Sequence, residues 1–558
     1  MKKFNTTVVC VPSKHYMVDL SNRVAEIKKL VDDGKYFTIN RARQYGKTTT
    51  LTALEQFLSE QYDVISIDFQ DITGADYIDE SGFVKGLAGV LCDTKDSMDI
   101  PIPGEYYDLF RSLADREGDA KLNDIFRIFD KLCKSNRKPV VWIIDEVDTA
   151  ANNQVFLDFL GKLRAGYLKK EKNPKYKTFQ SVILAGVTDV KHLRSKIRPE
   201  DEHKVNSPWN THENDEENGC LHPFDDHSWD HMALPYGIAA DFDIDMSLSE
   251  EGIKGMLDEY EADHHTDMDT AGIAKYIREY TNGYPYLVSR ICQIIDEKLV
   301  PEPFKELPEA WTLYGVDEAV KRIIQEDNTF FDSVMGKLVN MPNLKETLKN
   351  ILLRGETVAY LPDDEEQRLL RMYGFIYNNH NTVTVSNRIF EMRLYNYYIG
   401  ESKKNEDLKQ LAAANKSMFI RSDGTLDVRL IMERFIDEHN RIHKGETKQF
   451  LEQEGRERFL TYLSPIINGT GTYSIEEQTR DHKRMDVVVH YLGRRYIIEM
   501  KIWRGAKYNE DGEKQVVGYL DYFGLTTGYM LSFCFNKSKK SGVNEVQFWD
   551  KLLIEGIV

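Results

Sequence analysis

The sequence lacks any apolar run close to the roughly 20 residues that a membrane-spanning helix needs. Its basic start, MKKFNTTVVCVPSKHYMVDL, contains only a short apolar stretch and no small-residue cleavage site, so we expect no secretory signal peptide. The six cysteines, at positions 10, 92, 133, 220, 292 and 534, show no paired spacing. Scattered cysteines are typical of reduced thiols, and the sequence therefore predicts a cytoplasmic protein without a disulfide framework or a membrane partner.

Positive charge is also in short supply. The 73 basic residues are outnumbered by 91 acidic ones, and the net charge of −18 argues weakly against a non-specific nucleic-acid binder. The charge is uneven, however, because acidic residues crowd 200–230 and 241–270 whereas 480–507 is rich in Arg and Lys. A local basic face can still meet phosphates in an acidic chain. The length of 558 residues predicts three to four domains.

A phosphate-binding loop is indicated near the N-terminus. A strand-like stretch, Tyr36–Asn40, and a helix-like stretch flank Gly46, Lys47 and Thr48. In a P-loop the glycine lets backbone N–H groups surround phosphates, the lysine reaches the β/γ oxygens and the threonine hydroxyl holds Mg²⁺. The full pattern has a glycine five residues before Gly46, where this sequence has Arg41.

A second acidic motif supports this interpretation. The apolar run VVWIIDEVDT (140–149) predicts a central parallel strand that ends at Asp145 and Glu146. Asp145 would hold Mg²⁺ through water and Glu146 would orient the attacking water, although a strand followed by a solvated acidic turn has the same pattern. A further strand-like run, 181–190, ends in Thr188–Asp189, which is placed to sense a γ-phosphate. With 62–69, these four strand-like runs predict an α/β sheet.

The string NRARQYGKTTTL resembles the bacterial AAA-ATPase-like family, in which the first P-loop glycine is also replaced. The segments HYMVDLS (15–21) and SPWN (207–210) are similar to that family too, so the resemblance covers roughly residues 1–400. It implies an ATP site of the AAA+/STAND type, with Tyr16 near adenine unless Tyr16 is simply a core aromatic. The expected loop contacts are Arg43, Gln44, Tyr45, Gly46, Lys47, Thr48 and Thr49.

The middle of the chain predicts a helical lid and a winged helix. The string TNGYPYL resembles the Gly-x-Pro signature of STAND-type lids, which implies that Pro285 packs near adenine, although such a string also marks any turn before a helix. Arg290 could be a sensor arginine, and Arg194 and Arg198 could be arginine fingers; a surface or salt-bridge role is favoured for all three. Residues 343–395 are typical of a winged helix, a domain that often binds DNA. The candidate recognition helix is acidic, so a relay or packing role is favoured over DNA binding.

An insert at 211–235 interrupts the family-like order. It contains Cys220, His222, His227 and His231, which are zinc ligands by type, but the spacing fits no established metal pattern. A polar surface loop is therefore favoured over a zinc site.

The stretch MDVVVHYLGRRYIIEMK (485–501) predicts a β-hairpin with its turn at Leu492–Gly493. Counting outward from the turn places Asp486 opposite Glu499, and Lys501 shares their face. Asp486, Glu499 and the carbonyl of Met500 can hold Mg²⁺, or Mn²⁺, while Lys501 orients a water molecule. The alternative is a surface hairpin whose charges form a lysine–carboxylate cluster.

This spacing resembles the PD-(D/E)XK nuclease superfamily, with Met485 where proline is often found. Two neighbours add to the resemblance, which covers about 445–558: Glu457 matches the acidic residue of the first helix, and Gln515 with Tyr519 matches the QxxxY motif. The element order, helix, strand, strand–turn–strand, helix and strand, also agrees. Expected catalytic residues of the two sites are Glu146, Glu457, Asp486, Glu499, Lys501 and Gln515.

The sequence thus predicts an α/β multidomain protein. The expected domains are a P-loop core at 1–245, a helical lid at 246–330, a winged-helix-like domain at 331–403, a helical linker at 404–445 and a nuclease-like domain at 446–558. The leading hypothesis is an ATPase with a Mg²⁺-dependent nuclease that is gated by nucleotide, acts on DNA in preference to RNA and forms nucleotide-dependent homo-oligomers. The rival is a STAND-like switch whose nuclease-like domain only binds nucleic acid or protein; a translocase lacks support because no paired helicase motifs are present.

Overall fold

The computed structural model describes residues 2–151, 153–173, 175–187, 239–240, 242–354, 358–401, 406–442, 452–468, 470–478, 484–502, 506–534 and 540–558. The chain folds into two compact units. The N-terminal unit comprises Thr7–Ser247 and Met372–Gly374, and the C-terminal unit comprises Met1–Thr6, Leu248–Arg371 and Phe375–Val558. The boundary expected after residue 245 lies beside the point where the chain leaves the N-terminal unit.

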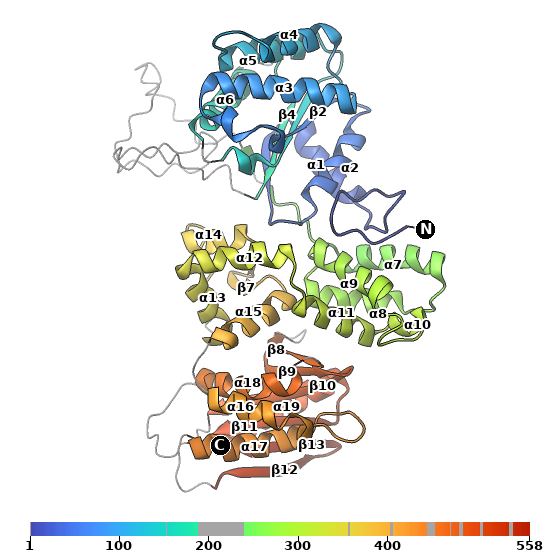
Figure 1. Ribbon diagram of the computed structural model, residues 1–558, viewed down its shortest axis with the longest axis vertical. Helices are drawn as coiled ribbons and strands as arrows, with labels where there is room; N and C mark the ends of the chain where they lie inside the picture. Colours follow the sequence, from blue (N-terminus) through green and yellow to red (C-terminus); the bar gives the residue numbers. More distant parts are fainter. Residues whose placement is uncertain are drawn as a thin grey trace, which may run out of the picture. The chain divides into compact units, whose positions relative to one another are not determined.

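The N-terminal unit is built on a five-stranded parallel sheet (Figure 1). Its strand order is β2 (Asp63–Asp68), β3 (Val140–Asp145), β4 (Ser181–Gly186), β1 (Tyr36–Asn40) and β5 (Ala239–Ala240). The predicted α/β sheet is therefore confirmed, including its four strand-like runs. Because β4 lies between β1 and β3, the ends of these three strands meet at one edge of the sheet.

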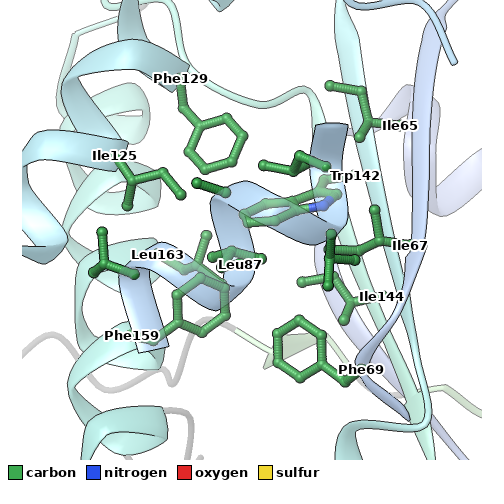
Figure 2. Close-up of a cluster of buried hydrophobic side chains, with 14 of the residues drawn as sticks. Ile65, Ile67, Phe69, Leu87, Ile125, Phe129, Trp142, Ile144, Phe159 and Leu163 are labelled. Carbon is green, nitrogen blue, oxygen red and sulfur yellow. The ribbon is translucent and has the colours of Figure 1, made fainter. Parts of the chain in front are cut away.

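Helices cover both faces of this sheet. On one face, α3 (Glu80–Met98), α5 (Leu122–Ser135) and α6 (Gln154–Lys172) pack around Trp142, as Figure 2 shows. On the other face, α1 (Ser21–Asp32) and α2 (Lys47–Leu58) pack against Val141 and Ile143. Strand β3 is buried along its whole length, which explains its uninterrupted apolar sequence.

The C-terminal unit begins with helices. The first group is α7 (Glu250–His264), α8 (Thr270–Thr281), α9 (Pro285–Lys298), α10 (Leu307–Ala310) and α11 (Leu313–Gln325). The second is α12 (Thr329–Asn340), α13 (Pro342–Arg354), α14 (Glu365–Met372), the antiparallel pair β6 (Ile376–Asn379) and β7 (Thr382–Val385), and α15 (Arg388–Glu401). The range 343–395, which was expected to be a winged helix, thus contains α13 and α14 followed by the β6–β7 pair.

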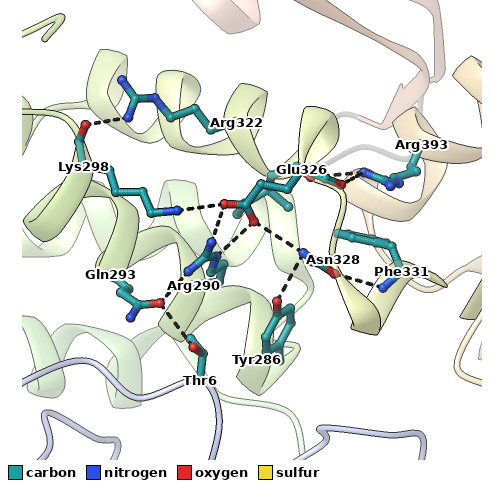
Figure 3. Close-up of polar contacts among 11 residues, drawn as sticks. Thr6, Tyr286, Arg290, Gln293, Lys298, Arg322, Glu326, Asn328, Phe331 and Arg393 are labelled. Atoms are coloured by element: carbon teal, nitrogen blue, oxygen red, sulfur yellow. Dashed lines mark hydrogen bonds and ion pairs between the residues drawn. The ribbon is translucent and has the colours of Figure 1, made fainter. Parts of the chain in front are cut away.

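Arg393 joins the second helical group to the end of the first, and Arg290 holds the segment between them (Figure 3). Arg290 of α9 forms an ion pair with Glu326, which follows α11 and also accepts a hydrogen bond from Lys298 at 3.2 Å. Arg393 of α15 donates to the carbonyl oxygens of Ile324 at 2.7 Å and Glu326 at 2.8 Å, at the C-terminal end of α11. Cations at a helix C-terminus satisfy its free carbonyl groups.

A six-stranded mixed sheet completes the C-terminal unit. Its order is β12 (Gly542–Phe548), β13 (Lys551–Ile557), β11 (Thr527–Phe533), β10 (Arg494–Ile502), β9 (Arg484–Tyr491) and β8 (Gly471–Gln478). Strands β10 and β11 are parallel and are joined through α19 (Ala506–Phe523), while β8, β9 and β10 are antiparallel. With α18 (Glu452–Ile467) before β8, the element order agrees with the one read from the sequence.

The segment that was expected as a linker is packed onto this sheet. It forms α16 (Glu406–Ala414) and α17 (Val428–Ile442). Helix α17 contacts β12 and β13, and a side chain at Gly556 would meet Met432 and Ile436. This close approach explains why a glycine occupies that point of β13.

Candidate functional site

The loop at 41–46 joins β1 to α2 in the manner of a phosphate-binding loop. Gln44 and Gly46 adopt left-handed backbone conformations, with φ of 55° and 77°, and α2 begins immediately afterwards at Lys47. The Lys47 Nζ folds back over the loop and donates to the carbonyl oxygens of Arg41 at 3.1 Å and Ala42 at 3.3 Å. A helix N-terminus and a lysine ammonium group thus lie at the same loop, an arrangement that suits phosphate oxygens.

Thr48 and Asp145 meet at the edge of the sheet. The Thr48 hydroxyl donates to Asp145 Oδ2 at 2.8 Å, and Asp145 Oδ1 accepts from the Glu146 backbone N–H at 2.9 Å. A hydroxyl beside a buried carboxylate is the type of oxygen pair that binds Mg²⁺. The donor set of this chain therefore fits a magnesium ion at this position.

Burial governs the electrostatics of this site. It lowers the pKa of Lys47, while the nearby carboxylates of Glu146, Asp145 and Asp148 act in the opposite direction. Burial also raises the pKa of Glu146, against the opposing effect of Lys47. Glu146 has a left-handed φ of 50° at the end of β3, which turns the chain sharply after Asp145.

Arg41 has a structural role that the motif did not reveal. Its guanidinium donates to the Asn40 carbonyl at 2.9 Å and, far along the chain, to the Ile244 carbonyl at 2.9 Å. It also lies over the Phe242 ring, 5.3 Å from the centroid. The residue that replaces the first P-loop glycine thus ties the loop to the segment that leads out of the N-terminal unit.

The other expected nucleotide contacts have varied surroundings. Arg43 and Gln44 are exposed, Tyr45 packs partly against the core, and the Thr49 hydroxyl accepts from the Cys10 N–H at 3.2 Å. Tyr16 is only 1% exposed, as a core aromatic would be. Asp148, which the sequence motif did not single out, accepts a hydrogen bond from the Val187 N–H at 2.7 Å and so links β3 to the end of β4.

Pro285 belongs to the C-terminal unit, where it is the first residue of α9. The preceding Gly283 has φ of 70°, and a Cβ there would lie 2.3 Å from the Leu248 carbonyl oxygen. The glycine is thus required by a close backbone approach. Arg290, a candidate sensor, is engaged by Glu326 (Figure 3), in line with the favoured salt-bridge role.

The hairpin in the C-terminal sheet has the predicted register. Tyr491 pairs with Arg494 and Val487 pairs with Ile498, so the two-residue turn at Leu492–Gly493 is confirmed. Both turn residues have positive φ, 48° and 70°, as the favoured hairpin turn requires. Extending this register by one pair places Asp486 beside Glu499.

Lys501 connects β10 to α19. Its Nζ lies 3.0 Å from Glu499 Oε1 and donates to Gln515 Oε1 at 3.1 Å, and the Gln515 amide in turn donates to the Tyr519 hydroxyl. A Cβ at Gly512 would lie 3.0 Å from Lys501 Cε, so the helix passes closely over the lysine. The QxxxY residues therefore hold the lysine in place.

Asp486 is held by two elements. Its Oδ2 accepts from the Met500 backbone N–H at 2.7 Å, and its Oδ1 accepts from Arg456 Nη2 at 2.9 Å. Met500 thus contacts Asp486 through its N–H, and the role of its carbonyl as a metal ligand stays a prediction. The sequence motif marks Glu457 instead, one residue further along α18, and one residue turns a helix by about 100°.

Glu499 is 1% exposed. Burial, then the negative charge of Asp486, raises its pKa to about 8, against the opposing effect of Lys501. Its Oε2 is buried without a hydrogen-bond partner among the described residues. An orphaned carboxylate oxygen beside a second carboxylate fits a divalent cation, but in the described part of the chain no group of three His, Cys, Asp or Glu residues could hold a metal, so Glu457 does not complete such a set.

Several expected residues lie outside the described part of the chain: Thr188, Arg194, Arg198, the string at 207–210 and the whole insert with its four candidate zinc ligands. No described helix is long and apolar enough to cross a membrane.

No family model and no curated protein matches the sequence. The solved structures that resemble the chain include a Walker-type ATPase. That protein, from Pyrococcus abyssi, matches with a TM-score of 0.44 and 13% identity. The match covers 70% of this chain and 99% of the Pyrococcus chain. Cdc6p from Pyrobaculum aerophilum (TM-score 0.29, 12% identity, 71% and 97% covered) and the Orc1 protein of Aeropyrum pernix in complex with DNA (0.28, 9%, 68% and 93%) are also similar. These scores assign no activity to this chain, and its function is inferred from its own residues.

Proposed function

We propose that the protein binds and hydrolyses ATP in its N-terminal unit and cleaves phosphodiester bonds at the Asp486–Glu499–Lys501 cluster. The observation that carries the first part is the hydrogen bond between Thr48 and Asp145, 2.8 Å long, at the start of a helix whose first residue is Lys47. Triphosphate oxygens would accept from the Lys47 ammonium group and the free N–H groups of α2. Thr48 and Asp145 would hold Mg²⁺, which neutralises phosphate charge, and Glu146 would orient the attacking water.

The second part rests on the convergence of Asp486, Glu499 and Lys501. Removing three ionisable side chains from water costs free energy. Binding a cation and a phosphate at this position would offset that cost. Asp486 and Glu499 would hold a Mg²⁺ or Mn²⁺ ion that polarises the scissile phosphate. Lys501, held by Gln515, would orient water or stabilise the developing negative charge on phosphate.

DNA is the favoured substrate, with a nuclease fold of the PD-(D/E)XK type. Gating by nucleotide state, homo-oligomer formation and a bacterial, cytoplasmic setting belong to the same proposal. Its support is the sequence resemblance, the element order around the C-terminal sheet and the contact of that sheet with helices α15 and α8 inside the C-terminal unit.

A specific observation favours a second candidate, a nucleotide-dependent switch that does not cleave. Both oxygens of Asp486 are already hydrogen-bonded within the protein. A carboxylate engaged in this way can serve a structural role alone, and the C-terminal sheet would then bind nucleic acid or protein.

Cleavage assays decide between the two. Plasmid and linear DNA would be incubated with Mg²⁺ or Mn²⁺ and the wild-type protein, Asp486→Ala or Lys501→Ala, while ATP hydrolysis is measured in parallel. The nuclease proposal predicts loss of cleavage with ATP hydrolysis intact. Absence of cleavage by the wild type with either metal and any nucleotide would favour the switch.

A further inference from the structure

Arg456 lies at the candidate metal site, although no sequence motif marks it. The residue is 6% exposed, and its Nη2 reaches Asp486 Oδ1 at 2.9 Å from helix α18. The opposite oxygen of Asp486 is held from strand β10 by the Met500 N–H. The carboxylate is therefore fixed between a helix and a strand before any cation arrives.

Each acid of this cluster has a basic partner within the protein. Asp486 and Glu499 supply two acidic groups, and Arg456 and Lys501 supply two basic ones, each within 3.0 Å of one acid. A guanidinium remains protonated across the working pH range of proteins. A divalent ion that binds Asp486 therefore brings its charge next to a guanidinium that is already positive.

The two acids differ in what they offer to an ion. Glu499 Oε2 has no hydrogen-bond partner among the described residues, so it can bind a cation without breaking a contact. Asp486 Oδ1 is occupied by the arginine. An ion that bridges the two carboxylates must take this oxygen from Arg456 or share it against charge repulsion.

We propose that Arg456 is a resident counter-cation that competes with the divalent ion for Asp486, so that the Arg456–Asp486 pair sets the metal affinity of the site. The inference rests on the proposed function only in that the site takes a divalent ion. Arg456 acts through Asp486 and is a positioning residue rather than a catalytic one.

The test measures the affinity of the full chain for Mn²⁺ in the absence of nucleotide. Electron paramagnetic resonance monitors the concentration of free Mn²⁺ during the titration. Asp486→Asn defines the signal that belongs to this site. Arg456→Gln keeps hydrogen-bonding capacity and removes the charge, so its Mn²⁺ affinity is expected to rise about tenfold. Arg456→Lys keeps the charge and is expected to remain close to wild type.

An unchanged or weakened affinity in folded Arg456→Gln overturns the inference, while Asp486-dependent binding by the wild type would leave the proposed metal site standing. If the wild type itself shows no Asp486-dependent binding, both the metal site and this inference fail.

A second measurement needs no substitution at Arg456 and covers the case in which Arg456→Gln does not fold. Phenylglyoxal labels accessible arginines, and mass spectrometry locates the label in the wild-type chain. Arg456 should be protected without Mn²⁺ and labelled faster when Mn²⁺ saturates the site, because the ion displaces it. Labelling that stays constant or falls contradicts the competition.

Discussion

The Arg388 guanidinium of α15 lies 3.0 Å from Nε2 of His490 in strand β9. Because arginine can only donate, His490 accepts through Nε2 and carries its proton on Nδ1. Arg388 also lies over the Tyr280 ring of α8, 4.6 Å from the centroid. Arg388 thus links helices α15 and α8 to the hairpin that carries Asp486 and Glu499 at its other end.

Removing Arg388 should therefore weaken any effect of nucleotide on cleavage. Arg388→Met is expected to retain the nucleotide-free cleavage rate and to reduce the change that ATP produces, since α15 would lose its hydrogen bond to the hairpin, although the Tyr280 ring of α8 still lies 6.1 Å from the His490 ring. Cleavage rates with and without ATP check this. A double-mutant cycle with His490→Ala is the control. The effects of substituting two contacting residues on the free energy of unfolding are expected to differ from additivity by roughly 0.5–3 kcal/mol. Additive effects would show that the contact carries no coupling.

The Thr48 hydroxyl should account for the magnesium dependence of nucleotide binding. Thr48→Ala is expected to lose about 10- to 100-fold in ATP affinity with Mg²⁺ present, the effect of losing a contact to a charged group. Thr48→Ser keeps the hydroxyl and is the matched control. Titration of a fluorescent ATP analogue with Mg²⁺ and with EDTA measures both. Equal magnesium dependence in the alanine variant and the wild type would mean that Thr48 is not an ion ligand.

Glu499 should make stability depend on pH. Its folded pKa, about 8, lies above the ordinary value of 4.5 because of burial first and Asp486 second. The folded state therefore favours the protonated carboxyl, and this contribution is complete below about pH 4.5 and is lost as the pH rises through about 8. Glu499→Gln stays neutral throughout, so its melting temperature relative to wild type should increase from pH 5 to pH 9 in metal-free buffer. A constant difference across this range would refute the prediction.

Gly283 should tolerate no side chain. An alanine there would combine a positive φ with a backbone clash against Leu248, and a loss of about 1–3 kcal/mol is expected for the strained backbone alone. Gly255, in helix α7, has open space within 4 Å of the position that a Cβ would take, and Gly255→Ala should stabilise by about 1 kcal/mol. Thermal unfolding of the two variants measures the contrast; similar effects of both substitutions would be inconsistent with the close approach.

Local patterns in the sequence predicted much of this structure. The Gly46–Lys47–Thr48 string placed the loop before α2, and Leu492–Gly493 fixed the hairpin register, because each depends on backbone preferences within a few residues. The uninterrupted apolar run around Trp142 predicted a strand buried on both faces. Such features need no knowledge of distant partners.

Features that depend on long-range contact could not be read in this way. Arg41 contacts the carbonyl of Ile244, about two hundred positions away along the chain, and no local pattern encodes that pairing. Arg456 contacts Asp486 from α18, and the rotation of a helix about its axis is set by packing with distant parts of the chain. The packing of α17 on the C-terminal sheet likewise gives no signal beyond its helical periodicity.

The most direct test of the account is one cleavage experiment. Single-stranded DNA, duplex DNA and RNA would be incubated with Mg²⁺, with and without ATP, and with wild type, Lys47→Ala or Lys501→Ala. The account predicts metal-dependent cleavage of DNA by the wild type that responds to ATP, cleavage that no longer responds to ATP in Lys47→Ala, and none in Lys501→Ala. Cleavage that survives in Lys501→Ala, or a wild type that cuts none of the three substrates, would contradict it.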